Sequence, residues 1–148
     1  MYRSILVAVD GSQSAEAALD EAIALARDHG ARLTLISVAA PPRLVLAGPY
    51  LAPVPAESQL RQTAEEIVER AASLVPDDVA VSTVVRTGPA AQAILERVEA
   101  AGHDLVVMGS RGLGGLGMLV LGSVSRDVLA RSPVPVHLVR AGLTAHSA

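Results

Sequence analysis

Short apolar runs alternate with amphipathic stretches along the whole chain. The run from Ser4 to Val9 is continuous and ends in a polar turn, which is typical of a strand buried on both faces of a sheet. The pattern predicts further strands at residues 32–38, 79–85, 104–108 and 134–140. It predicts helices over 15–26, 58–74, 89–101 and 123–131. Strands and helices therefore follow one another in strict alternation.

Several helix ends carry their own signals. In the first helix the apolar residues recur with helical spacing and form one stripe: Ala15, Ala18, Leu19, Ala22, Ile23 and Ala26. Gly30 stands where a C-cap belongs. Pro89 suits the first turn of the third helix, and Ser123 is the expected N-cap of the fourth. The helix boundaries are thus predicted independently of the strands.

The alternation predicts a doubly wound α/β domain. Parallel strands need crossover connections, and right-handed crossovers place helices on both faces of the sheet. We expect one five-stranded parallel sheet in the order 3-2-1-4-5. A chain of 148 residues fits a single domain, which we place at residues 1–142 with a flexible tail at 143–148.

A proline-rich segment at residues 39–57 interrupts the pattern between the second strand and the second helix. Its prolines exclude a regular helix or a central strand: Pro41, Pro42, Pro49, Pro53 and Pro55. Such a connection is long for a compact α/β domain. Two interpretations stay open, a mobile insertion or a lid over a site.

Composition removes several classes of function. The chain has no cysteine, and its 12 basic residues are all arginine, which excludes thiol chemistry, a P-loop lysine and Schiff-base catalysis. Aromatic residues are limited to Tyr2 and Tyr50, and the formal net charge is −3. We therefore expect no nucleic-acid partner. The four histidines show no ligand spacing, and with neither a signal peptide nor a membrane span in the pattern we expect a cytoplasmic protein.

The glycine motif after the fourth strand is the main candidate for chemistry. Gly109 and Gly112 follow the strand, and Gly122 with Ser123 begins the next helix, in the spacing Gly-x2-Gly-x9-Gly-Ser. Backbone N–H groups at such a helix start favour phosphate. We expect these groups at Val124, Ser125 and Arg126, helped by the serine hydroxyls and by the charge of Arg111 or Arg126.

Other interpretations of these glycines were weighed. A flexible surface turn would explain them without a ligand. The spacing Gly112-x-Gly114-x-x-Gly117 also matches a dinucleotide fingerprint, but Pro135, Val136 and His137 occupy the region where its acidic residue belongs. A phospho-acceptor receiver domain would need a lysine. A phosphate loop is the interpretation that fits the position of the motif best.

Asp10, at the end of the first strand, is the second candidate. Its carboxylate could accept hydrogen bonds from a ribose or an adenine amine, or simply cap the turn at Gly11 and Ser12. In the predicted strand order Asp10 and Gly109 flank the point where the sheet changes direction. That placement favours ligand contact.

The motifs together resemble those of a known family. The stretches ILVAVDGS, LTLISV, DLVVMGSRG, LGSVS and SPVPVHLVR are similar to those of the universal stress protein family, over nearly the whole chain. The Gly-x2-Gly-x9-Gly-Ser motif resembles that of its ATP-binding branch.

The resemblance implies a nucleotide site and a homodimer. It implies contacts with the adenosine part and the adenine pocket from Ala8, Asp10 and Val38. It implies contacts with the ribose and phosphates from Met108, Gly109, Ser110, Arg111, Gly112, Gly122, Ser123, Val124 and Ser125. It also implies ATP, with Mg²⁺, as the cofactor and a dimer through the last strand, where Val134, Val136 and Leu138 are apolar.

Three functions follow as expectations. The first is an ATP-binding stress protein that acts as a nucleotide-dependent sensor or regulator, with slow hydrolysis or none. The second is an enzyme on the same fold that hydrolyses ATP or transfers a nucleotidyl group, or a binder of another adenine nucleotide such as cyclic AMP. The third is an interaction module without a ligand.

Overall fold

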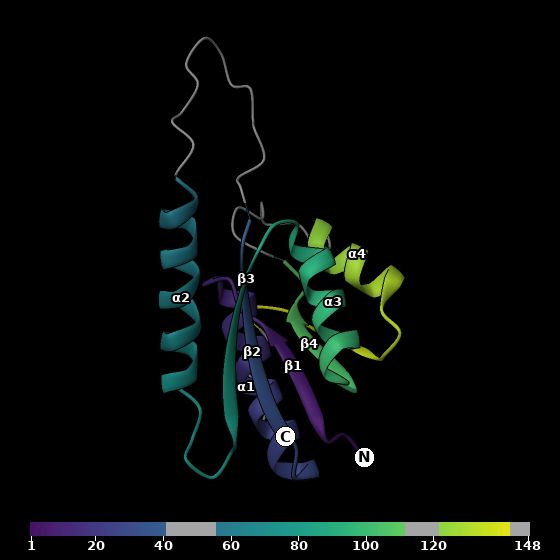
Figure 1. The fold of residues 1–148 in the computed structure, drawn as a ribbon. Helices are drawn as coiled ribbons and strands as arrows, with labels where there is room; N and C mark the ends of the chain where they lie inside the picture. The colour runs from purple at the N-terminus through teal and green to yellow at the C-terminus, as the bar shows by residue number, and fades with distance from the viewer. Residues whose placement is uncertain (41–55, 112–121, 143–148) are drawn as a thin grey trace.

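The computed structural model describes residues 1–40, 56–111 and 122–142. Its strands are β1 (Ser4–Ala8), β2 (Arg32–Ala39), β3 (Val81–Thr87), β4 (Leu105–Gly109) and β5 (Val136–Val139). Its helices are α1 (Gln13–His29), α2 (Glu57–Ser73), α3 (Ala90–Ala101) and α4 (Ser123–Arg131). Figure 1 shows the helices on both sides of the sheet.

The five strands form one sheet in the order β3-β2-β1-β4-β5, and every neighbouring pair is parallel. This confirms the predicted fold class and strand order. β1 lies in the middle, where Val7 pairs with Leu35 of β2 and with Val107 of β4. All three side chains are fully buried, as continuous apolar strands in a two-sided sheet require.

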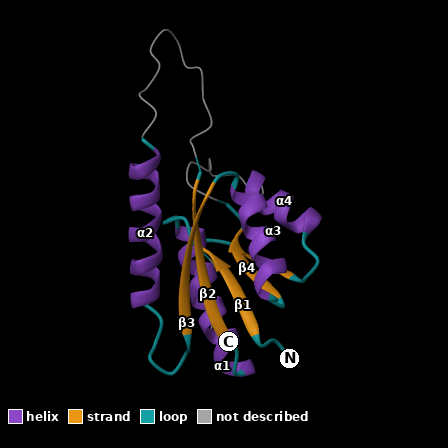
Figure 2. Ribbon diagram, viewed as in Figure 1, coloured by secondary structure: helices purple, strands orange, loops and turns teal. Residues whose placement is uncertain are grey.

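Two hydrophobic clusters fill the spaces between the sheet and the helices. The cluster under α1 and α2 includes Val7, while the cluster under α3 and α4 includes Leu6, because successive side chains of a strand point to opposite faces. Figure 2 shows α3 and α4 together on one face of the strands. The carboxyl ends of all five strands meet at one edge of the sheet.

Helix ends confirm some predictions and correct others. Ser12 is the N-cap of α1, its hydroxyl accepting from the Ala15 N–H at 3.2 Å, and Gly30 ends the helix in the left-handed conformation at φ 67°. Pro89, however, is the N-cap of α3, with extended backbone at φ −61° and ψ 126°. Gly122 rather than Ser123 caps α4.

Some predictions fall on residues outside the described ranges. β2 ends at Ala39 and α2 begins at Glu57, so the connection runs over residues 40–56, of which 41–55 lie outside. Gly112 and the tail 143–148 lie outside as well. In the described parts of the chain, each helix is too short or too polar to cross a membrane.

Candidate functional site

The glycine motif and Asp10 come together at the switch point of the sheet. The chain leaves β1 toward β2 on one side, and β4 lies on the other side of β1. Val7 pairs with Val107, so Asp10 and Ser110 each follow three residues beyond this pair. Open parallel sheets bind ligands in the crevice at this place.

Gly109 is required by the neighbouring helix α1. A Cβ at this position would lie 2.7 Å from the carbonyl carbon and 2.8 Å from the Cβ of Ser14, closer than real contacts allow. The prediction assigned the missing side chain to ligand access, which stays a prediction, and the structure adds a second reason, the close approach of α1 and β4. The hydroxyl of Ser14, a residue that sequence reasoning missed, donates to the backbone carbonyl of Arg111.

Two hydrogen bonds hold the start of α4 against the end of β4, and a third ties the end of β4 to β5. The Gly122 N–H donates to the Ser110 carbonyl at 2.8 Å, and the Ser110 N–H donates to the Val139 carbonyl at 2.8 Å. The buried hydroxyl of Ser125 donates to the Gly109 carbonyl at 2.7 Å. The two sides of the glycine motif are therefore fixed to one another.

The N–H groups at the start of α4 differ from those predicted by one residue. The Arg126 N–H donates to the Gly122 carbonyl at 3.0 Å, so the groups without an acceptor inside the helix are those of Ser123, Val124 and Ser125. The Ser125 hydroxyl is bonded to β4, and the Ser123 side chain is exposed. The helix dipole makes this end partly positive, which suits an anion.

Asp10 caps the turn at Gly11 and Ser12, as one of its two interpretations predicted. One carboxylate oxygen accepts from the Ser12 N–H at 2.9 Å, while Gly11 takes φ 83°. A carboxylate has several acceptor positions, so this turn leaves capacity on the half-buried side chain. A ligand contact at Asp10 stays a prediction.

The apolar residues assigned to the site lie on the face covered by α3 and α4. Ala8 is the last residue of β1 and Val38 the next-to-last residue of β2, and both pack partly buried against the second cluster. Met108 belongs to that cluster and is only 4% exposed, so most of it serves the core. The half-buried Ala8 and Val38 are the residues of this group that a ligand can reach.

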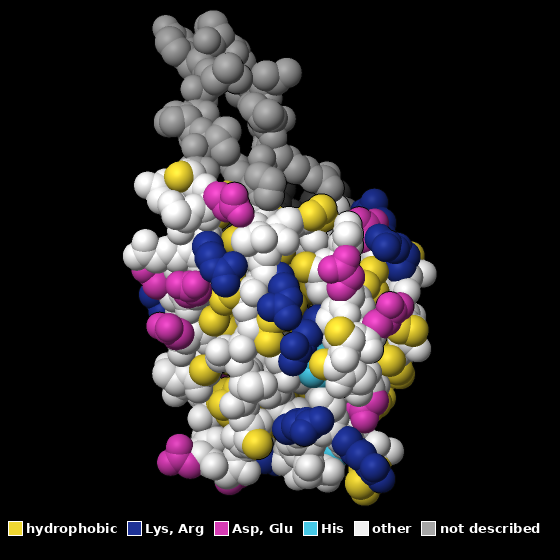
Figure 3. Space-filling view, in the orientation of Figure 1, with side chains coloured by type: hydrophobic (Ala, Val, Ile, Leu, Met, Phe, Trp, Pro, Cys, Tyr) yellow, Lys and Arg dark blue, Asp and Glu magenta, His cyan; other side chains and the backbone are white. Residues whose placement is uncertain are grey.

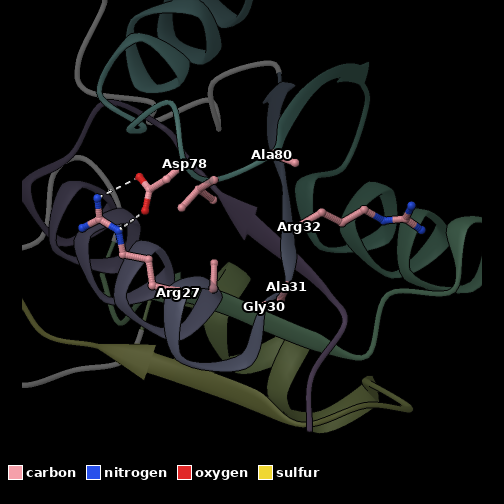
Figure 4. Close-up of a pocket in the computed structure, with 8 residues that line it drawn as sticks. Arg27, Gly30, Ala31, Arg32, Asp78 and Ala80 are labelled. Atoms are coloured by element: carbon pink, nitrogen blue, oxygen red, sulfur yellow. Dashed lines mark hydrogen bonds and ion pairs between the residues drawn. The ribbon is translucent and has the colours of Figure 1, made fainter.

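The opposite, amino-terminal edge of the sheet has a hollow of its own. It measures about 440 Å³ between α1 and the start of β3. Arg27 forms a two-point ion pair with Asp78, both contacts measuring 2.9 Å (Figure 4). Hydrogen bonding from Arg27 lowers the pKa of Asp78. Arg27 and Asp78 satisfy each other's charge, and Arg32, which also lines the hollow, points away from this pair (Figure 4).

Fold and site together define a class of doubly wound α/β domain with an anion-favouring helix start at the switch point. The profile of the universal stress protein family matches residues 1–140, and the chain belongs to that family. It is similar to a universal stress protein of Thermus aquaticus, with 39% identity over 146 residues that cover 95% of this chain and 100% of the relative. It is also similar to the universal stress protein YxiE of Bacillus subtilis, with 34% identity, 95% of this chain and 100% of the relative.

Solved structures share the fold. Protein MJ0577 superposes with a TM-score of 0.77 at 26% identity, covering 97% of this chain and 99% of its own. A universal stress protein of Archaeoglobus fulgidus in complex with dAMP has a TM-score of 0.69 at 22% identity, covering 93% and 98% of the two chains. A family protein of Arabidopsis thaliana with AMP bound has a TM-score of 0.69 at 20% identity, covering 95% and 93%.

Proposed function

We propose that this chain binds an adenine nucleotide, ATP with Mg²⁺, at the carboxyl edge of the sheet and acts as a nucleotide-dependent sensor or regulator in the stress response. The observation that carries the proposal is the fixed start of α4, where the N–H groups of Ser123, Val124 and Ser125 open at the switch point. Two solved neighbours hold dAMP and AMP, which supports the adenine base as part of the ligand.

In this proposal each end of the site has its own task. The N–H groups of α4 and the exposed Ser123 hydroxyl bind phosphate oxygens, and Gly122 keeps the helix start clear of a side chain. Asp10 accepts from the ribose, and Ala8 and Val38 border the adenine. Gly109, Ser110, Arg111 and Met108 shape the wall between them.

The proposal includes slow hydrolysis or none. The chain has no lysine, and within the described ranges no three His, Asp or Glu residues gather as metal ligands. The nucleotide phosphates would therefore supply most of the ligands of Mg²⁺. Rapid turnover of ATP in a coupled phosphate-release assay would instead favour an enzyme.

Calorimetry with ATP, AMP, cyclic AMP and GTP tests the site. Gly122 has φ −60° and ψ 154°, a conformation open to any residue, so Gly122→Leu should fold and lose ATP binding by at least about tenfold. Ala130→Leu introduces the same side chain at an exposed position of α4 and is the control. ATP binding by Gly122→Leu at the parent's affinity would place the phosphates elsewhere, and binding of none of the four nucleotides would remove the proposal.

The proposal also includes a homodimer through β5. Among the described residues this strand pairs only with β4 in the sheet, and an unpaired edge is a template for a second chain. Val136 and Leu138 of β5, and Val134 just before the strand, are half-buried. Sedimentation should show a dimer that Val136→Arg dissociates and that Leu129→Arg, on exposed α4, leaves intact. A cytoplasmic location is part of the same proposal and is checked by cell fractionation.

A further inference from the structure

The face of the sheet under α3 and α4 is left partly uncovered. β3 is exposed over most of its length, and Ile94 and Val98 of α3 pack in the cluster that includes Leu6 of β1 and Val106 of β4. A groove of about 370 Å³ runs over β2 and β3 next to α3, near the amino ends of the strands. Its polar lining consists of Ser4, Arg32, Thr34, Ser82, Arg97 and His103. This groove lies at the edge opposite the proposed nucleotide site.

Positive charge gathers in the groove without a matching carboxylate. Arg32 is exposed and points away from the Arg27–Asp78 pair (Figure 4). The nearby carboxylate of Asp104 accepts from the backbone N–H groups of Arg3 and Ser4, at 2.9 and 3.1 Å. Among the described residues neither Arg32 nor Arg97 forms an ion pair. Figure 3 shows basic side chains, all arginine in this chain, in a column down this face.

His103 fixes the orientation of Arg97. The Arg97 Nε–H can only donate, and it donates to His103 Nε2 at 3.3 Å. The neutral His103 ring therefore carries its proton on Nδ1 and donates to the Ser4 hydroxyl at 2.8 Å. With Nε engaged, the two terminal nitrogens of Arg97 remain for an end-on contact with two oxygens of an anion.

Hydroxyl groups add to the donors of the groove. The Thr34 and Ser82 hydroxyls lie 3.1 Å apart across β2 and β3. One of them donates to the other, so one hydroxyl hydrogen of the pair is left to donate to a ligand. Two arginines, Arg32 on β2 and Arg97 on α3, and one hydroxyl hydrogen from the sheet can all donate to the same ligand. Such a set of donors suits an anion with several oxygens and two negative charges.

We propose that this groove binds the phosphate group of a small phosphate ester, with Arg32 and Arg97 supplying the charge and the Thr34–Ser82 pair a hydroxyl donor. The volume of about 370 Å³ is within the range of small-molecule sites and leaves room for the rest of the ester. Because the groove and the carboxyl edge share no residue, the proposal does not depend on the proposed function.

His103 reports occupancy of the groove. Burial lowers its pKa, and the charges of Arg97 and Arg32 lower it further, while Asp104 acts in the opposite direction. A phosphate dianion would offset the two arginines. The pKa of His103, followed by NMR of its ring, should therefore rise when inorganic phosphate is added at constant ionic strength.

Titration by NMR with inorganic phosphate and with glycerol phosphate tests the proposal. We expect saturable shifts at the amides of Thr34 and Ser82 with a dissociation constant on the order of 1 mM. Arg32→Gln and Arg97→Gln should each weaken binding at least about tenfold. Arg32→Gln loses no hydrogen bond or ion pair of the described residues and should fold normally. Arg70→Gln, exposed on α2, removes the same charge elsewhere and should bind as the parent does.

Three results would overturn the proposal. The first is phosphate binding of parent strength in Arg32→Gln and Arg97→Gln. The second is a set of shifts confined to Ser123–Ser125, which would mean that phosphate binds the carboxyl edge alone. The third is a groove that binds inorganic phosphate but does not bind glycerol phosphate. That result would show that the ligand is not a phosphate ester.

Discussion

Replacing Gly109 by alanine tests the close packing of α1 against β4. The new Cβ would lie 2.7 Å from the carbonyl carbon of Ser14 and 2.8 Å from its Cβ, and nearer still to its hydroxyl oxygen. One of these atoms is backbone, and the hydroxyl is bonded to the Arg111 carbonyl. The clash is therefore relieved only if the start of α1 moves away from the sheet.

The size of the effect follows from two opposing terms. Forcing one carbon into a packed interior costs about 1–3 kcal/mol, and the backbone contact at Gly109 argues for the upper end. Gly109 does not have a positive φ, so alanine can adopt its backbone conformation. Alanine also lowers the conformational entropy of the unfolded chain, which raises the free energy of unfolding by about 0.4–1 kcal/mol. We expect a net loss of about 2 kcal/mol in the free energy of unfolding, or about 4–8 °C in Tm.

Urea and thermal unfolding measure this loss, and a double-mutant cycle identifies its cause. Ser14→Gly removes two of the three crowded atoms and leaves the carbonyl carbon. The two substitutions together should therefore be less destabilising than the sum of the single ones, by roughly 1 kcal/mol. A Gly109→Ala protein within about 0.5 kcal/mol of the parent would refute the packing argument.

Three further predictions concern stability. Ser125→Ala removes the buried hydroxyl that donates to the Gly109 carbonyl and should cost about 1–2 kcal/mol in urea unfolding. Leu19→Ala, at 2% exposure in the first cluster, should cost about 2–5 kcal/mol, and a smaller loss would mean that the site collapses. The pKa of His103 is lower in the folded protein than its ordinary value of 6.5. His103 therefore makes its full contribution to the free energy of unfolding above pH 6.5. That contribution is lost at lower pH, because the unfolded chain takes up the proton first. As the pH falls from 6.5 toward about 5, the free energy of unfolding should decrease more steeply in the parent than in His103→Gln, and equal slopes would contradict the assignment.

The alternation of strands and helices could be predicted because each element carries its own pattern. β1 and β4 are continuous apolar runs, and α1 has one apolar stripe ended by Gly30. The strand order 3-2-1-4-5 was a hypothesis taken from the doubly wound class, because the crossover rules place the helices but leave more than one order open. The errors lie at element ends: Ser123 looks like a cap by residue type, but the extended backbone at Gly122 makes glycine the cap.

The contacts that define the two edges could not be predicted, because they join residues far apart in the chain. Ser14 meets Gly109 only when α1 packs on β4, and nothing near either residue in the sequence marks that distance. The histidines show no ligand spacing in the sequence, so His103 was assigned no role. Its bonds to Ser4 and Arg97 depend on tertiary packing.

The polarity of a parallel sheet explains why the two edges would hold an anion by different means. At the carboxyl edge helices begin, so backbone N–H groups and the positive end of α4 are available there. At the amino edge α1 and α3 end, and their carbonyl ends disfavour an anion, so the groove depends on arginine side chains. Arg32→Gln should therefore weaken phosphate binding in the groove more than Ser123→Ala weakens nucleotide binding, because backbone donors survive a side-chain substitution. If Ser123→Ala weakened nucleotide binding more than Arg32→Gln weakened phosphate binding, side chains rather than the backbone at the start of α4 would bind the nucleotide.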